Sequence, residues 1–583
     1  MGKSVSLLLT AALCIIALFC SCDARRGVVT VRVVATSDVH GNVFGHDALD
    51  GKERDGSLAK IASLLKKERK ENGNLVYLDA GDILQGSVEM YMDNTAEFVK
   101  PNLAGSAYNL LGCDAMALGN HELAIGLESS DRFLSTAGFP VLAANIGFSD
   151  YGDYYPPYQI IERHGVRIAV LGLVTPAVEY TIPADIMGEF GVCDLESAAS
   201  HWIPVLREEE KADVIIGLVH SGIENDRSRQ ADAETVDRID SLMERISGFD
   251  MIIYGHDHRA GISRRTDSAG DSIWVANPGP YAENAVVADI SLDFRSGSTP
   301  EPVIGAWIEN VSSLRPDADF EKALADRWDD TQAYCDSVIG TLDIPLVARD
   351  ALWNTSSAVD FIHSVHMSFY GAQVSVTSAV QNVDVIPAGK VTMRDMFSVY
   401  PFDNTMVSLM LTGNEIRRLL EYSADRYYNT VSDQNPGLLR LERTKNGSMK
   451  TEYPAEQYLT AAGIVYTIDV TKAYGERVRV LSMSDGSAFN PDSYYRTTIS
   501  SFLFGGSESV LGPATGLSGM ELQERLCAST KADIRYYMIT RLALARDAGK
   551  SITVKKLSDW SLIPEKTVDE YLAKDTIDLK TTH

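Results

Sequence analysis

Five short motifs in the first half of this chain combine carboxylate, imidazole and amide side chains. In chain order they are D-V-H at 38–40, G-D at 81–82, G-N-H-E at 119–122, H-S-G at 220–222 and G-H-D-H at 255–258. Such donors together suit divalent ions such as Zn²⁺, Mn²⁺, Co²⁺ or Fe²⁺. A carboxylate that bridges two ions holds them about 3.5–4 Å apart, which suits in-line displacement at phosphorus. The motifs therefore predict a two-metal site for phosphoester hydrolysis.

Apolar runs typical of buried strands precede these motifs and must position them. They are VTVRVVAT, NLVYLDA, RIAVLGLVT, DVIIGLVH and FDMIIYG, with helical stretches such as SLAKIASLLKKERKE between them. Alternating strands and helices predict a layered α/β core. Ligands collect at the carboxyl ends of such strands, so motifs far apart in sequence can converge there. Each motif alone is weak, because an isolated histidine after a strand is usually structural; the ordered set is specific.

Size and charge limit the function. A chain of 583 residues is too long for one ordinary core, so we expect at least two domains. The formal net charge of −27, from 80 acidic and 53 basic residues, argues against binding a nucleic-acid duplex. A small phosphate substrate remains compatible with this charge, because bound cations reverse its sign inside one cleft.

The N-terminus has the pattern of an export signal. Lys3 is followed by an apolar run from Val5 to Phe19, too short for an ordinary membrane span. The ending L-F-C-S-C resembles a bacterial lipoprotein cleavage box and predicts a signal peptide over 1–22 with lipid on Cys22. A plain signal peptide cut nearby is the alternative. We expect an exported protein, in the periplasm or at the outer-membrane surface, that touches the membrane only through its lipid anchor.

The second half has a different pattern of elements. We expect a catalytic domain over 28–310, a linker helix over 311–338 and a second domain over 339–583. In that last part, FIHSVHMSF and NEIRRLLEYSADRYY are predicted helices, and VSLMLTG and AGIVYTIDV are predicted strands. His363 and His366 have helical spacing but no accompanying carboxylate motif, so a packing role is favoured for them.

The five motifs, in this order, resemble those of the calcineurin-like metallophosphoesterase superfamily. The segment YPFDNTMVSLMLTGNEIRRLLE and the later AAGIVYTIDVT and GERVRVLSM resemble the 5′-nucleotidase C-terminal domain. Together they resemble the periplasmic 5′-nucleotidase and 2′,3′-cyclic-nucleotide phosphodiesterase family. The resemblance implies a layered α/β metallophosphoesterase sandwich followed by a second α/β (α+β) domain that selects the substrate.

The resemblance also implies roles for individual residues. One ion would be held by Asp38, His40, Asp82 and His258, and the other by Asp82, Asn120, His220 and His256. His121 matches the family's catalytic histidine, which stabilises or protonates the leaving oxygen. The nucleophile would be a metal-bound hydroxide, without a phosphoenzyme.

Three departures from the family pattern bear on activity and substrate. Where many members have an aspartate that orients the catalytic histidine, this chain has Ala124. The usual N-G-G-I-R motif is absent, which favours the cyclic phosphodiesterase branch. Tyr458, Phe502 and Phe504 are the candidates for the aromatic residues that stack on the base.

The predicted function is therefore hydrolysis of a nucleotide phosphoester by an exported two-metal enzyme whose metal identity is open. One alternative keeps the metals but changes the substrate to a non-nucleotide ester such as a sugar phosphate. Another is a weakly active nucleotide-binding surface lipoprotein, which Ala124 motivates.

Overall fold

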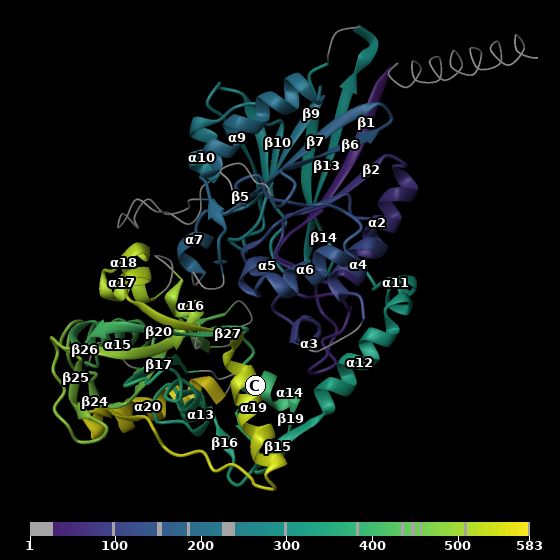
Figure 1. The fold of residues 1–583 in the computed structure, drawn as a ribbon. Coiled ribbons are helices and arrows are strands. Elements are labelled where there is room, and N and C mark those ends of the chain that lie inside the picture. Colours follow the sequence, from purple (N-terminus) through teal and green to yellow (C-terminus); the bar gives the residue numbers. More distant parts are fainter. Residues whose placement is uncertain are drawn as a thin grey trace, which may run out of the picture. The chain divides into compact units, whose positions relative to one another are not determined.

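The computed structural model describes residues 27–95, 100–147, 154–182, 187–223, 239–296, 300–379, 384–432, 437–444, 449–454, 457–505 and 510–580. The chain forms two compact units, and apart from two short segments grouped with the second unit, the division lies between Trp328 and Asp329 (Figure 1). Among the described residues, no helix is both long and apolar enough to cross a lipid bilayer. The predicted signal peptide and its lipidation residue, Cys22, lie outside these residues.

The first unit is built on two sheets. In its described part, one sheet has the order β14-β13-β1-β2-β3-β4 and the other β11-β12-β10-β9-β7-β6. The first sheet comprises β1 (Val28–Thr36), β2 (Leu75–Asp79), β3 (Ala115–Ala117), β4 (Val141–Leu142), β13 (Asn284–Asp293) and β14 (Val303–Asn310). The second comprises β6 (Tyr158–Arg163), β7 (Val166–Val174), β9 (Val214–His220), β10 (Met251–Tyr254), β11 (Gly261–Thr266) and β12 (Ser272–Asn277).

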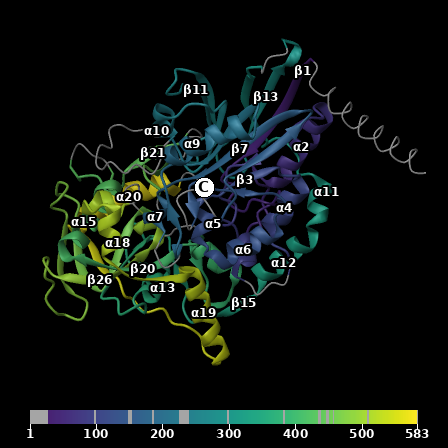
Figure 2. The same ribbon diagram turned by 45° about the horizontal axis from the view of Figure 1, so that its top comes forward.

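The two sheets face each other across an apolar core. This core takes Val33 and Leu78 from one sheet and Val170, Ile216 and Ile253 from the other, each fully buried. Helices cover the outer faces, with α2 (Leu58–Glu71) and α4 (Leu103–Leu111) on one side and α9 (Leu195–Pro204) and α10 (Ile239–Arg245) on the other (Figures 1 and 2). The layered α/β sandwich predicted from the sequence is confirmed.

Burial on both faces explains the strand sequences. Strands β1 to β4 run parallel to one another, as do β7, β9, β10 and β12. A parallel strand covered on both faces reads as a continuous apolar run, and all seven residues of β9 are buried. Such strands all end at the same edge of their sheet.

The segment after β14 forms two helices, α11 (Ala318–Ala323) and α12 (Ala325–Asp336), where the sequence predicted one. The Asp317 carboxylate caps the first of these, accepting from the backbone N–H groups of Asp319 and Phe320. The boundary between the two units falls inside α12. The domain limits of 28–310, 311–338 and 339–583 stay predictions.

The second unit contains a five-stranded sheet, ordered β23-β17-β26-β20-β27 within the described residues, and a smaller sheet, β25-β24-β28. Their strands are β17 (Val374–Ser378), β20 (Thr405–Thr412), β23 (Leu459–Ala462), β24 (Ile464–Asp469), β25 (Val478–Met483), β26 (Tyr494–Ser500), β27 (Leu526–Asp533) and β28 (Asp559–Ile563). The principal helices are α13 (Ser357–His366), α15 (Gly413–Tyr427), α19 (Ile534–Asp547) and α20 (Glu565–Lys580).

Helix α15 illustrates how the local sequence fixes an element of this unit. Thr412 and Glu415 form a reciprocal capping box that starts the helix. Its apolar face, carrying Ile416, Leu419 and Leu420, is buried in the core. The predicted helix over 414–428 therefore agrees closely with α15, and the predicted strand over 407–413 with β20.

Candidate metal centre

The polar motifs of the first unit lie at the carboxyl ends of its parallel strands. Asp38 and His40 follow β1, and Asp82 follows β2. The short helix α5 (Asn120–Ala124) follows β3 and carries His121. On the second sheet, His220 is the last residue of β9, and the loop 255–258 follows β10.

The backbone at these positions adopts an unusual conformation. Asp38, His40, Asp82, His256 and His258 all have positive φ, between 48° and 81°. A non-glycine residue rarely occupies this region, and such strain concentrates at functional sites because the surrounding structure must hold it. The side chains of these residues are therefore directed by tightly constrained turns.

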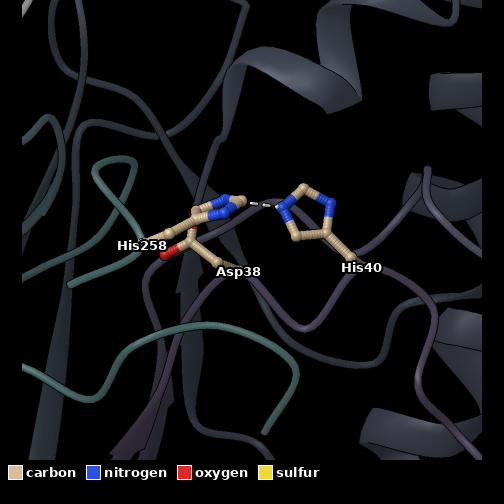
Figure 3. Close-up of side chains that lie close together, drawn as sticks. All are labelled: Asp38, His40 and His258. Atoms are coloured by element: carbon tan, nitrogen blue, oxygen red, sulfur yellow. Dashed lines mark hydrogen bonds and ion pairs between the residues drawn. The ribbon is translucent and has the colours of Figure 1, made fainter. Parts of the chain in front are cut away.

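One group of donor atoms is formed by Asp38, His40 and His258 (Figure 3). The Nε2 atoms of the two histidines are 2.9 Å apart, and the His258 Nε2 lies 3.5 Å from an Asp38 carboxylate oxygen. Two imidazole nitrogens and a carboxylate oxygen thus lie within reach of one point. This mixed nitrogen and oxygen set fits a borderline divalent cation.

A second group of donor atoms is formed by Asp82, His220 and His256. The His220 Nε2 is 3.0 Å from an Asp82 oxygen. The Asn120 amide oxygen lies between the two imidazoles, 3.1 Å from the His220 Nε2 and 2.9 Å from the His256 Nδ1.

Asp82 also belongs to a third group, with His40 and His121. It therefore lies close to imidazoles of both other groups. The structure thus brings all seven predicted ligands together, and Asp82 belongs to two of the three donor groups.

Burial and charge set the protonation states of these groups. Burial lowers the pKa of His40 and of His256 to about 3, so both imidazoles are neutral at neutral pH. Burial raises the pKa of Asp38 to about 7. Burial opposes charge at His220 too, but the adjacent Asp82 outweighs it and raises the pKa of His220 to about 10. A bound cation would replace the His220 proton as the partner of Asp82.

Backbone carbonyls hold two of the imidazoles in place. The Nδ1 of His220 donates to the Ala80 carbonyl at 2.7 Å, and the Nδ1 of His40 donates to the Gln85 carbonyl at 3.1 Å. A hydrogen bond at Nδ1 fixes the tautomer and directs the Nε2 lone pair toward the centre.

Glu122 clamps the loop that carries Asp82. Its buried carboxylate accepts hydrogen bonds from the backbone N–H groups of Asp82, Ile83, Leu84 and Gly119, at 2.8, 2.9, 3.0 and 2.9 Å. Sequence reasoning missed this role. An acidic residue at the third position of a helix is the capping signal that could have indicated it.

His121 lies beside the donor groups with its side chain 36% exposed. Its backbone N–H donates to an Asp82 oxygen at 2.9 Å, and its Nε2 is 3.8 Å from the other Asp82 oxygen. Its Nδ1 is hydrogen-bonded to the side-chain oxygen of Gln85. Gly119 has to be glycine, because a Cβ atom there would lie 2.1 Å from an Asp82 oxygen.

The predicted base-stacking residues have different environments. Tyr458 and Phe504 are fully buried in the core of the second unit, and the Tyr458 hydroxyl is hydrogen-bonded to that of Tyr428 at 2.7 Å. Neither ring has a free face for a base in this conformation, which argues against stacking here, and the stacking role of these two residues stays a prediction. Phe502 is 48% exposed, and its stacking role stays a prediction.

Two family models match this chain. Residues 31–260 match the calcineurin-like phosphoesterase model, and residues 338–512 match the model of the 5′-nucleotidase C-terminal domain. The fold and the family define a hydrolase of the metallophosphoesterase class. The chain belongs to the nucleotidase and phosphodiesterase family in which these two domains are combined.

The names of similar proteins are consistent with this family. The chain is 25% identical to the trifunctional nucleotide phosphoesterase YfkN of Bacillus subtilis over 79% of its own length, which spans only 34% of that protein. It is 24% identical to the 2′,3′-cyclic-nucleotide 2′-phosphodiesterase/3′-nucleotidase of Yersinia enterocolitica, with 69% of each chain covered.

Solved structures show the same fold. A Staphylococcus aureus protein assigned as a 5′-nucleotidase superposes with a TM-score of 0.71 at 20% identity, covering 92% of this chain and all of that one. The NAD nucleotidase of Haemophilus influenzae superposes with a TM-score of 0.59 at 16% identity, covering 92% of this chain and 99% of that one. At these identities, the likeness concerns the fold alone.

Proposed function

We propose that this protein is an exported two-metal hydrolase of nucleotide phosphoesters. The observation that carries the proposal is the convergence of seven donor side chains in overlapping groups that are linked through His40 and Asp82. One ion would be held by Asp38, His40, Asp82 and His258. The other would be held by Asp82, Asn120, His220 and His256.

In the proposed mechanism the cations supply positive charge and His121 supplies a proton. Bound divalent cations supply the charge that neutralises phosphoryl oxygens and acidifies a water nucleophile. His121 lies just outside the donor groups, with Nδ1 occupied by Gln85. Its Nε2 is therefore free to hold the proton that the leaving oxygen needs, which is general acid catalysis.

A nucleotide substrate is supported by the relatives, which are named as nucleotide phosphoesterases and as a cyclic-nucleotide phosphodiesterase. The absence of N-G-G-I-R favours a cyclic phosphodiester over a nucleoside monophosphate. In this proposal the catalytic domain spans 28–310, and a domain over 339–583 selects the substrate. The signal peptide over 1–22 with lipid on Cys22 would place the enzyme in the periplasm or at the outer-membrane surface.

One observation favours a second candidate. Because Tyr458 and Phe504 are buried, Phe502 is the only one of the three predicted stacking residues with an exposed ring. A base would then gain less from stacking, which is worth about 1–3 kcal/mol per base. A non-nucleotide ester, such as a sugar phosphate, is the alternative substrate.

The test is an assay of the purified protein with Mn²⁺ or Zn²⁺ against 2′,3′-cyclic AMP, AMP, a UDP-sugar and bis-p-nitrophenyl phosphate. We expect hydrolysis of the cyclic ester that EDTA abolishes and metal restores. Hydrolysis of AMP but not of the cyclic ester would reverse the preference within the family. Bound metal without turnover of any of the four substrates would refute a hydrolytic function.

A further inference from the structure

We infer that Gln85 is the positioning residue of His121 and takes the place of the acidic partner that Ala124 cannot supply. The inference rests on the proposed function, because it assigns how the general acid of that site is oriented. Its basis is the hydrogen bond between the Gln85 side-chain oxygen and the His121 Nδ1. Gln85 itself belongs to none of the predicted ligand positions.

The backbone on both sides of Gln85 is held firmly. The N–H groups of Ile83 and Leu84 donate to the Glu122 carboxylate, and the Leu84 carbonyl accepts from the Asn94 side chain at 2.6 Å. The Gln85 carbonyl accepts from the Nδ1 of His40 at 3.1 Å. The side chain of Gln85 therefore extends from a fixed point toward His121.

The residue after Gln85 must be small for this arrangement. Gly86 has a φ of 117°, and a Cβ atom there would lie 2.8 Å from the Cβ of His40. The turn at 85–86 is thus packed directly against a predicted metal ligand. One residue consequently holds two imidazoles, His40 through its carbonyl and His121 through its amide.

The nearby carboxylates are engaged elsewhere. Glu122 accepts four backbone N–H groups, and Asp82 faces the other ring nitrogen of His121, with 3.8 Å between Nε2 and the nearer oxygen. Ala124, one helical turn after His121, has no polar side chain. Among the described residues, the structure pairs the His121 Nδ1 with Gln85.

An amide oxygen orients the imidazole without adding charge. It accepts the Nδ1–H of both neutral and protonated imidazole, so Nε2 remains the atom that exchanges a proton with substrate. A carboxylate in that place would add a negative charge close to Asp82. Gln85 therefore fixes the tautomer and direction of the ring.

The test compares Gln85→Leu with Gln85→Glu, which keeps an acceptor oxygen. Since partners of this kind contribute about 10–100-fold, Gln85→Leu should lower kcat by about that factor. KM and the metal content should stay unchanged in Gln85→Leu. Gln85→Glu should retain most of the wild-type kcat. Gln159→Leu, on the edge strand β6, is a matched control with wild-type activity.

A second measurement does not depend on activity. Histidine-selective ¹⁵N labelling of the metal-free protein reports the ring tautomer of each of the 11 histidines, with His121→Ala identifying the signal of interest. Wild-type protein should show the Nδ1–H tautomer at His121, and Gln85→Leu should show a mixture. Circular dichroism checks that each variant is folded.

The outcomes separate the two proposals. An unchanged kcat and an unchanged tautomer in Gln85→Leu would overturn the role of Gln85, and so would a loss of kcat that is matched by a loss of metal. If the wild-type protein hydrolyses none of the esters but its His121 tautomer depends on Gln85, the proposed function fails while the positioning role stands.

Discussion

Two pairs of buried histidines, one in each unit, have opposite surroundings. In the first unit, His40 and His220 lie beside Asp38 and Asp82 at the ends of parallel strands. In the second unit, the Nδ1 atoms of His363 and His366 face the Ser375 hydroxyl at 2.8 and 3.1 Å. The other ring nitrogen of His363 faces the Thr460 hydroxyl at 3.1 Å.

The pKa values follow from these surroundings. Burial lowers the pKa of both His363 and His366 to about 3, so they are neutral polar groups of a packed core. His220 is just as buried, yet Asp82 raises its pKa to about 10. A buried histidine therefore becomes a candidate ligand when carboxylates converge with it, and histidine spacing alone does not make a metal site.

The largest expected effect comes from removing the shared carboxylate. Asp82→Asn removes the central negative charge, so the surroundings of His40 and His220 become more like those of His363 and His366. We expect activity to fall by at least about 10²–10³-fold and the metal content to fall with it, as measured by steady-state kinetics and elemental analysis. His363→Gln is the contrasting variant, and its metal content should be that of the wild type. Full metal occupancy in Asp82→Asn would contradict the bridging role.

Weakening the clamp on the Asp82 loop should have the next largest effect. In Glu122→Gln, an amide NH₂ group would face backbone N–H groups that now donate to a carboxylate. We expect metal affinity to fall by about 10–100-fold, measured by competition with a chromophoric chelator. Glu128→Gln, an exposed change on the neighbouring helix α6 (Leu127–Thr136), should bind metal normally. Wild-type affinity in Glu122→Gln would mean that the loop is held by other contacts.

His220 should also differ from His363 and His366 in its dependence on pH, because its pKa alone is raised. A metal ion must displace the proton of His220, so metal binding at pH 8 should release about one proton and strengthen about tenfold per pH unit. Calorimetry in buffers of different ionisation enthalpy measures this proton release. His363→Gln should not alter it, and binding without proton release would contradict the ion pair.

The same raised pKa has a consequence for the metal-free protein. Because the folded pKa of His220 lies above its ordinary value of about 6.5, its contribution to stability is complete below that pH and is lost as pH rises toward about 10. In the presence of a chelator, the contribution of the His220–Asp82 pair to the free energy of unfolding should therefore decline between about pH 6.5 and about pH 10, as measured by thermal unfolding.

The smallest effect is expected from adding a carboxylate. Ala124→Asp supplies the acid that many family members have beside the catalytic histidine. Because Gln85 already holds the His121 Nδ1, we expect kcat to change by less than about threefold, which is under 1 kcal/mol. A tenfold rise in kcat would show that Gln85 orients the ring incompletely.

Several features of this protein follow from its sequence alone. The buried strands read as continuous apolar runs because both of their faces are covered, and the polar motifs stand where those runs stop. The layered fold, the family and the set of converging side chains could therefore be predicted. Because ligands gather at the carboxyl ends of parallel strands, the convergence of motifs that are far apart in the sequence could also be predicted.

Only the tertiary structure decided the partners of those side chains. Gln85 and Glu122 act on residues that are 36 and 40 positions away, a pairing that no local pattern contains. The structure also shows that Tyr458 and Phe504 are buried whereas Phe502 is exposed. The sequence could not show this, because a segment rich in aromatic residues does not reveal which ring faces the core. Sequence determined which groups could perform the chemistry, and packing determined which atoms orient them, because hydrogen bonds depend on distances that arise only when the chain is folded.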